Sequence, residues 1–200
     1  MFFNSLILFI GLLVSLFIFW KRLKEDYSSE IIFNSIFTIY TTFLISILIS
    51  SKFLPIWFFW IQFAGILIGL TIAVYKNKIR FYESFEPLIF SFTPLLTLLF
   101  LRDAALNSSF SSFLAFTFML ILIFVFYYVD SHYKNFVWYR SGKIGLSGLL
   151  ILFLFFVIRA TTSVFLPHVL SFSGKIEPFI SGLSAGTVAV AIFILGRTEK

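Results

Sequence analysis

Cysteine is absent from this 200-residue sequence, histidine occurs only twice, and only 12% of the residues are charged. Without cysteine, the chain has no disulfide, no thiolate zinc site, no cysteine nucleophile and no cysteine of its own to carry a lipid. The two histidines, His132 and His168, are too far apart in the sequence to suggest a metal-ligand cluster. We therefore expect no metal and no cofactor.

Apolar residues dominate instead, at 60% of the chain, and the mean hydropathy is +1.04. A soluble protein carries about 25% charged residues, twice the share found here. The apolar residues fall into runs about as long as the 20 residues that a helix needs to cross a bilayer. The sequence predicts an all-α, polytopic membrane bundle of about seven transmembrane helices in one domain covering 1–200. The expected spans are 2–20, 31–50, 56–75, 85–101, 110–129, 144–167 and 178–196.

The basic residues are distributed unevenly between the two sets of connecting segments. Eleven of the fifteen lie in 21–24, 76–80, 134–143 and 197–200, and only Lys52, Arg102 and Lys175 lie in the opposite set. By the positive-inside rule, this predicts an external N-terminus and a cytoplasmic C-terminus in a prokaryotic plasma membrane. The net charge of +6 therefore indicates topology and not nucleic-acid binding.

Arg159 lies inside the sixth apolar run, 144–167. An arginine at mid-helix costs about 2.5 to 3.5 kcal/mol on insertion, so it usually faces a bundle interior, a polar partner or a lipid headgroup. The alternative is that its long side chain snorkels to the nearer interface.

Small and helix-breaking residues indicate how the helices pack. Gly65 with Gly69, and Gly182 with Gly186, form two GxxxG patterns, which we interpret as contacts between helices of the bundle, with association of separate chains as the alternative. Pro94 interrupts the fourth run and predicts a kinked or broken helix there.

Few polar residues remain as candidates for chemistry. Gln62 lies early in the third run, and Glu86 starts the fourth. Arg102 follows that run and has two interpretations: an interfacial ion pair with Asp103, or a cationic pocket formed with Arg159 for a phosphate headgroup. His168 is interpreted as an interfacial residue and not as a general base. Serine-hydrolase and nucleotide-binding motifs are missing.

Three stretches, FIFWKRLKEDYSSEIIFNSIF, IQFAGILIGLTIAVYKNKIRFYESFEPL and SGKIGLSGLLILFLFFVIRA, together with the order of loops, resemble the prolipoprotein diacylglyceryl transferase family. These enzymes have seven membrane helices and an external N-terminus. They transfer diacylglycerol from phosphatidylglycerol to a lipoprotein cysteine. The resemblance implies membrane lipid, in particular phosphatidylglycerol, and a lipoprotein precursor as partners.

The resemblance is incomplete when it is carried over residue by residue. The family's essential histidine falls near Gln62, which cannot act as a base, and the arginine of its G-R-I-G-N signature has Arg102 as its nearest counterpart. Its penultimate-helix arginine corresponds to Arg159, but the glutamate expected four residues later is Ser163.

The resemblance therefore implies Arg159, Arg102 and Gln62 as the catalytic positions, with Arg102 and Arg159 binding lipid. We expect a divergent relative that binds lipid and has weakened or lost transfer chemistry. The alternative is a non-enzymatic membrane protein, either a small transporter or a helix-packing subunit of a complex. The oligomeric state is left open.

Overall fold

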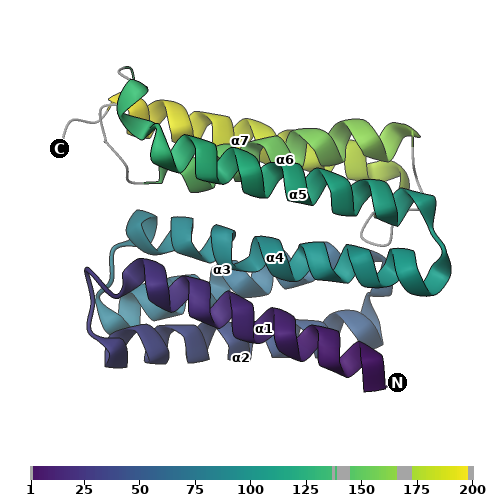
Figure 1. The fold of residues 1–200 in the computed structure, drawn as a ribbon, viewed down its shortest axis with the longest axis horizontal. Coiled ribbons are helices and arrows are strands. Elements are labelled where there is room, and N and C mark those ends of the chain that lie inside the picture. Colours follow the sequence, from purple (N-terminus) through teal and green to yellow (C-terminus); the bar gives the residue numbers. More distant parts are fainter. Residues whose placement is uncertain (1, 137, 139–144, 166–172, 198–200) are drawn as a thin grey trace.

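The computed structural model describes residues 2–136, 138, 145–165 and 173–197, and in them the chain forms seven long α-helices and no strand (Figure 1). This confirms the all-α fold class. The helices are α1 (Phe2–Leu23), α2 (Ser29–Phe53), α3 (Phe58–Asn77), α4 (Phe81–Asn107), α5 (Phe110–Ser131), α6 (Leu146–Phe165) and α7 (Glu177–Arg197). Short 3₁₀ turns at Pro55–Trp57 and Gly174–Ile176 lead into α3 and α7, and a third, Tyr133–Asn135, follows α5.

Consecutive helices run in opposite directions, so the bundle has two distinct ends (Figure 1). We call the end where α1, α3, α5 and α7 finish the basic end, because their last turns hold Arg22, Lys76 and Arg197. The opposite end is called the far end. Helices α2 to α7 are each long and apolar enough to cross a membrane by length and composition. The protein is therefore a multi-pass membrane protein.

Helix α4 is the centre of the bundle. Two thirds of its most apolar stretch is buried, a larger share than in the other described spans. It packs against α1, α5 and α6, while α2 pairs mainly with α3, and α6 pairs with α7. Large apolar side chains on the outer helices, such as Phe37, Phe124 and Phe179, are each 73% exposed. Such side chains are suited to contact lipid tails, because the bilayer core is as apolar as they are.

The two GxxxG patterns lie in different surroundings. A Cβ on Gly69 would lie 2.8 Å from the Ile39 Cα, and one on Gly65 would lie 2.6 Å from the Ser46 Cβ, so α3 approaches α2 closely at both positions. A Cβ on Gly182 or Gly186 would have no neighbour within 4 Å among the described residues. Close packing within this chain requires glycine in α3 and does not require it in α7.

Helix α4 runs without a break from Phe81 to Asn107 although it contains Pro87 and Pro94. Of the two alternatives expected at Pro94, a broken helix is therefore wrong, and a kink stays a prediction. Neighbouring hydroxyls bond to the helix backbone around the second proline: Thr93 donates to the Ile89 carbonyl and Thr97 to the Thr93 carbonyl, both at 2.8 Å. Burial of α4 among its neighbours keeps the helix continuous.

Candidate functional site: a buried ion pair beside an apolar cavity

Arg159 forms an ion pair with Glu177, the first residue of α7. The Arg159 Nη2 lies 2.7 Å from the Glu177 Oε1, and its Nε donates to the same oxygen at 2.8 Å. The arginine side chain is 4% exposed and the glutamate side chain is fully buried. Arg159 therefore faces the bundle interior and a polar partner, and the snorkelling alternative is wrong.

Three further groups donate hydrogen bonds to the Glu177 carboxylate. The Trp60 indole N–H and the Ser173 backbone N–H both reach Oε2 at 3.0 Å, and the Ser181 hydroxyl reaches Oε1 at 2.6 Å. A buried carboxylate needs this many donors, because each unfilled acceptor position in a low dielectric carries a desolvation penalty. The cluster fastens the start of α7 to α3 and α6.

Aromatic rings surround the Arg159 guanidinium. Its Cζ lies 3.8 Å from the centroid of the Phe59 ring, 5.7 Å from that of Phe155 and 5.8 Å from that of Trp60. These distances fall in the range of cation–π attraction, which strengthens when the cation is desolvated. Phe59 and Phe155 also line the cavity described next, so they separate the ion pair from it.

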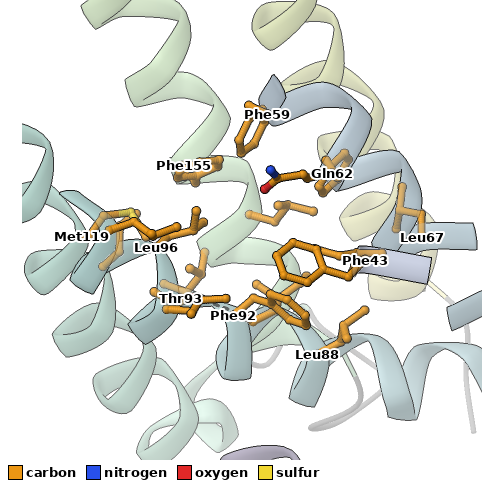
Figure 2. Close-up of a pocket in the computed structure, with 18 of the residues that line it drawn as sticks. Phe43, Phe59, Gln62, Leu67, Leu88, Phe92, Thr93, Leu96, Met119 and Phe155 are labelled. Carbon is orange, nitrogen blue, oxygen red and sulfur yellow. Dashed lines mark hydrogen bonds between the residues drawn. The ribbon is translucent and has the colours of Figure 1, made fainter. Parts of the chain in front are cut away.

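A cavity of about 90 Å³ lies between α3, α4 and α6 and is completed by α2 and α5 (Figure 2). On α4 its lining runs from Phe85 to Leu99, which corresponds to about 21 Å of helix at 1.5 Å per residue. Leu67 of α3 and Leu96 of α4 line it while remaining partly exposed, so the cavity reaches the lipid-facing surface. Its length and its open rim suit part of an alkyl chain.

Gln62 and Thr93 are the polar residues among those that line the cavity. The Thr93 hydroxyl is already bonded to its own helix, whereas the buried Nε2 of Gln62 has no hydrogen-bond partner among the described residues. Gln62 is only 8% exposed, and Figure 2 shows its amide among apolar side chains. A buried amide donor in that position is costly unless another molecule accepts its hydrogen bond.

The other sequence-predicted residues lie at the end of α4. Arg102 is partly exposed and is not part of the cavity lining. Asp103 accepts hydrogen bonds from the Asn107 amide, at 2.7 Å, and from the Ser112 hydroxyl at the start of α5. Gln62 and Arg159 thus share the neighbours Phe59 and Phe155, whereas Arg102 lies outside that group. His168 lies outside the described residues.

A second charged cluster, at the basic end, joins four helices. Arg22 of α1 contacts Asp130 of α5 at 2.7 Å and Glu86 of α4 at 3.0 Å. Glu86 also accepts from the Ser147 hydroxyl at 2.8 Å and from the Gly145 backbone N–H at 3.1 Å. Gly148 allows α6 to approach α4 closely enough for these hydrogen bonds, because a Cβ at this position would lie 2.8 Å from the Glu86 Cα.

Sequence reasoning selected Arg159 but missed Glu177, which lies just outside the expected seventh span and inside the observed helix. It also noted Glu86 without its partner Arg22. An acidic residue at the start of a span, facing an intramembrane arginine in the preceding span, is the signal that could have found the first pair. Among the described residues, no group of three or more His, Cys, Asp or Glu side chains could hold a metal ion.

Comparison with known proteins finds no matching family model, no similar curated protein and no similar solved structure.

Proposed function

We propose that this multi-pass membrane protein binds a phospholipid at the cavity between α3 and α4, as a divergent relative of the prolipoprotein diacylglyceryl transferases that has lost the transfer chemistry. The observation that carries the proposal is the cavity itself. It is apolar, elongated along α4 and partly open, and Leu67 and Leu96 are among the lining residues that are partly exposed. Ligand sites in proteins are typically such apolar cavities with a few polar groups that fix orientation.

The residues around the cavity support binding better than catalysis. Gln62, at the position of the family's histidine, has an amide that neither accepts nor releases a proton under ordinary conditions. Arg159 is engaged by Glu177, so its charge is compensated and separated from the cavity by aromatic rings. The resemblance implies a glutamate four residues after the arginine, where this chain has Ser163, and we propose that Glu177 of the next helix serves as the carboxylate partner instead. A paired arginine can position a helix, and among the described residues that line the cavity no side chain is a base for thiol activation.

Phosphatidylglycerol is the proposed lipid, and Arg102 is the proposed contact for its phosphate. Arg102 is partly exposed at the far end of α4, beyond Leu99 at the end of the cavity lining. A guanidinium can bind a phosphate through two parallel hydrogen bonds. The test is competition in vesicles containing equal phosphatidylglycerol and phosphatidylcholine, with lipids retained by the purified protein measured by native mass spectrometry.

We expect the wild type to retain phosphatidylglycerol preferentially and Arg102→Gln to lose most of that preference. Lys52→Gln is the matched control, because it removes the same charge at the same end from an exposed position. Equal retention of both lipids by the wild type would refute phosphatidylglycerol specificity, and retention of no lipid would refute lipid binding.

A transfer assay tests whether the diacylglyceryl transferase activity has been lost. Protein in phosphatidylglycerol vesicles is incubated with a lipobox peptide, the simplest form of a lipoprotein precursor, and the diacylglyceryl thioether is sought by mass. We expect no product from folded protein. A thioether that forms with wild type but not with Arg159→Leu would show that the chain is an active transferase.

We also propose that the basic end faces the cytoplasm of a prokaryotic cell, which places the N-terminus outside. The excess of basic residues at that end supports this orientation. Because the chain lacks cysteine, single cysteines introduced at Lys24 and at Lys52 can be labelled with a membrane-impermeant maleimide in intact cells. We expect labelling at position 52 only, and the reverse pattern would overturn the orientation.

A second candidate function is that of a subunit that associates through α7. The specific observation is the open space beside Gly182 and Gly186, where close packing is available to another helix. Crosslinking in native membranes should then yield a product that Gly186→Leu eliminates and Thr187→Leu leaves unchanged, because Thr187 is exposed and lies about 100° around the helix from Gly186. A product unaffected by both substitutions would exclude this face.

A further inference from the structure

We infer that the cavity holds one acyl chain of a glycerolipid, and that Gln62 Nε2 donates a hydrogen bond to the ester carbonyl of that chain. The inference rests on the proposed lipid-binding function and makes it specific. It predicts selection for an ester linkage, which a purely apolar cavity would not provide.

The depth of Gln62 supports an ester as the acceptor. Gln62 is the fifth residue of α3 and lies about 6 Å along the helix from Phe58. Trp57 immediately precedes that helix, and tryptophan is enriched at the membrane–water interface. The amide therefore lies just below the far-end interface, at the depth where a glycerolipid has its ester groups.

The shape of the cavity supports a single chain. Beyond Gln62 the lining is apolar except for Thr93, and it continues along α4 to Phe85, close to the basic end. The length of the lining along α4 suits one extended chain, so the headgroup and the second chain remain outside the cavity. This arrangement places a chain lengthwise in the cavity with its carbonyl at Gln62.

The unpartnered Gln62 Nε2 provides an independent reason for a ligand. Within the part of the chain that the structure describes, no group accepts its hydrogen bond, although Gln62 is only 8% exposed. In the hydrocarbon region, polar groups normally find a partner within the protein or in a bound molecule. An ester carbonyl accepts hydrogen bonds and donates none, which matches the Nε2 amino group, a donor with two N–H bonds. The Arg159 guanidinium lies against the Phe59 ring and already donates to Glu177, so it does not take the place of Gln62 as the donor.

The test compares two lipids that differ only at the linkage. Dipalmitoyl phosphatidylglycerol carries ester carbonyls, and dihexadecyl phosphatidylglycerol has ether linkages without them. The purified full-length protein is equilibrated with equal amounts of both, and the retained lipids are counted by native mass spectrometry. We expect about threefold to tenfold more ester lipid than ether lipid, the effect of one net hydrogen bond.

Two variants assign this preference to the cavity. Gln62→Met keeps the side-chain volume, removes the donor, and should retain both lipids equally while remaining folded, since it deletes an unpaired buried polar group. Leu67→Phe should reduce retention of both lipids by filling the cavity. The matched control is Ile68→Phe, because Ile68 is the next residue and is 55% exposed toward lipid, so retention should not change.

The possible failures are distinguishable. If the wild type retains both lipids equally, or if Gln62→Met keeps the ester preference, the inference is overturned while lipid binding stands. Retention unaffected by Leu67→Phe would place the lipid outside the cavity and would also overturn it. If wild type retains neither lipid, the proposed function itself fails.

Discussion

Each end of the bundle holds a buried or half-buried arginine paired with acidic side chains, one at the far end and two at the basic end, but the two clusters differ in access to water. At the far end, the Arg159 and Glu177 side chains are 4% and 0% exposed. At the basic end, the Arg22, Glu86 and Asp130 side chains are 23%, 9% and 18% exposed. The same charge chemistry therefore operates in a sealed setting and in a partly hydrated one. The comparison teaches that side-chain exposure, and not the number of ion pairs, should decide how much each arginine contributes to the free energy of unfolding.

Each cluster also joins different helices. The sealed cluster connects α3, α6 and α7, the helices around the far end of the cavity, whereas the hydrated one connects α1, α4, α5 and the start of α6. Desolvated pairs resist separation because a lone charge would remain buried. Partly hydrated pairs are replaced by water at modest cost. The far end should consequently be the more rigid one.

Arg159→Leu should produce the largest effect. It leaves the Glu177 carboxylate buried without its cation, so we expect a loss of about 3–5 kcal/mol in the free energy of unfolding, measured by titration with SDS in mixed micelles. Arg197→Leu is the control, because Arg197 is an exposed arginine stacked on Phe193. Equal losses in the two variants would remove the distinction between sealed and hydrated arginines.

Arg22→Leu should have an intermediate effect. Water can reach Glu86 and Asp130 once the guanidinium is removed, so we expect a loss of about 1–2 kcal/mol in the same titration. Lys21→Leu, at the neighbouring exposed position, should change the free energy of unfolding little. A loss as large as that of Arg159→Leu would show that the basic end is effectively sealed as well.

The dependence of the coupling energy on salt concentration should also distinguish the two clusters. Raising the ionic strength from 0.1 to 1 M shortens the Debye length from about 10 to about 3 Å and screens hydrated charges. A double-mutant cycle on Arg22 and Asp130 should show a coupling energy that falls by roughly half over this range. The cycle on Arg159 and Glu177 should not change, and a parallel decrease in both would contradict the assigned burial.

The smallest effect is expected from Tyr27, in the connection after α1 at the basic end. Its hydroxyl donates to Glu83 at 2.8 Å. Burial raises its pKa above the ordinary 10.0, because the phenolate form is disfavoured there, and the nearby Glu83 carboxylate acts in the same direction. The stability contributed by Tyr27 is therefore complete below pH 10 and is lost as the pH rises through the raised pKa.

Tyrosinate absorbance measures this directly. The difference between the titrations of wild type and Tyr27→Phe should show one tyrosine ionising above pH 10.0, and the variant should lose less stability at alkaline pH. Tyr75→Phe serves as the control, since Tyr75 is 90% exposed. A difference curve for Tyr27 centred at or below 10.0 would refute the assigned burial.

Much of the fold could be predicted from the sequence, because the membrane allows few solutions. A helix satisfies its own backbone hydrogen bonds, so an apolar run of about 20 residues predicts its own structure without reference to the others. The helical class and the approximate spans followed from this rule. The helix boundaries were less accurate: α4 extends to Asn107, and α7 begins at Glu177, one residue before the expected span. Polar residues at helix ends weaken the hydropathy signal although their backbone is helical.

The candidate site depended on contacts that periodicity does not encode. The sequence alone established that Arg159 lies in an apolar span, where the energetic cost of its charge must be offset. Only the tertiary structure decided that Glu177 is its partner, that Arg22 pairs with Glu86 and Asp130, and that Gln62 faces a cavity. The physical reason is that apolar surface surrounds every helix in a bilayer, so hydrophobicity does not identify the inward face. Packing selects that face, and it thereby determines which polar groups meet.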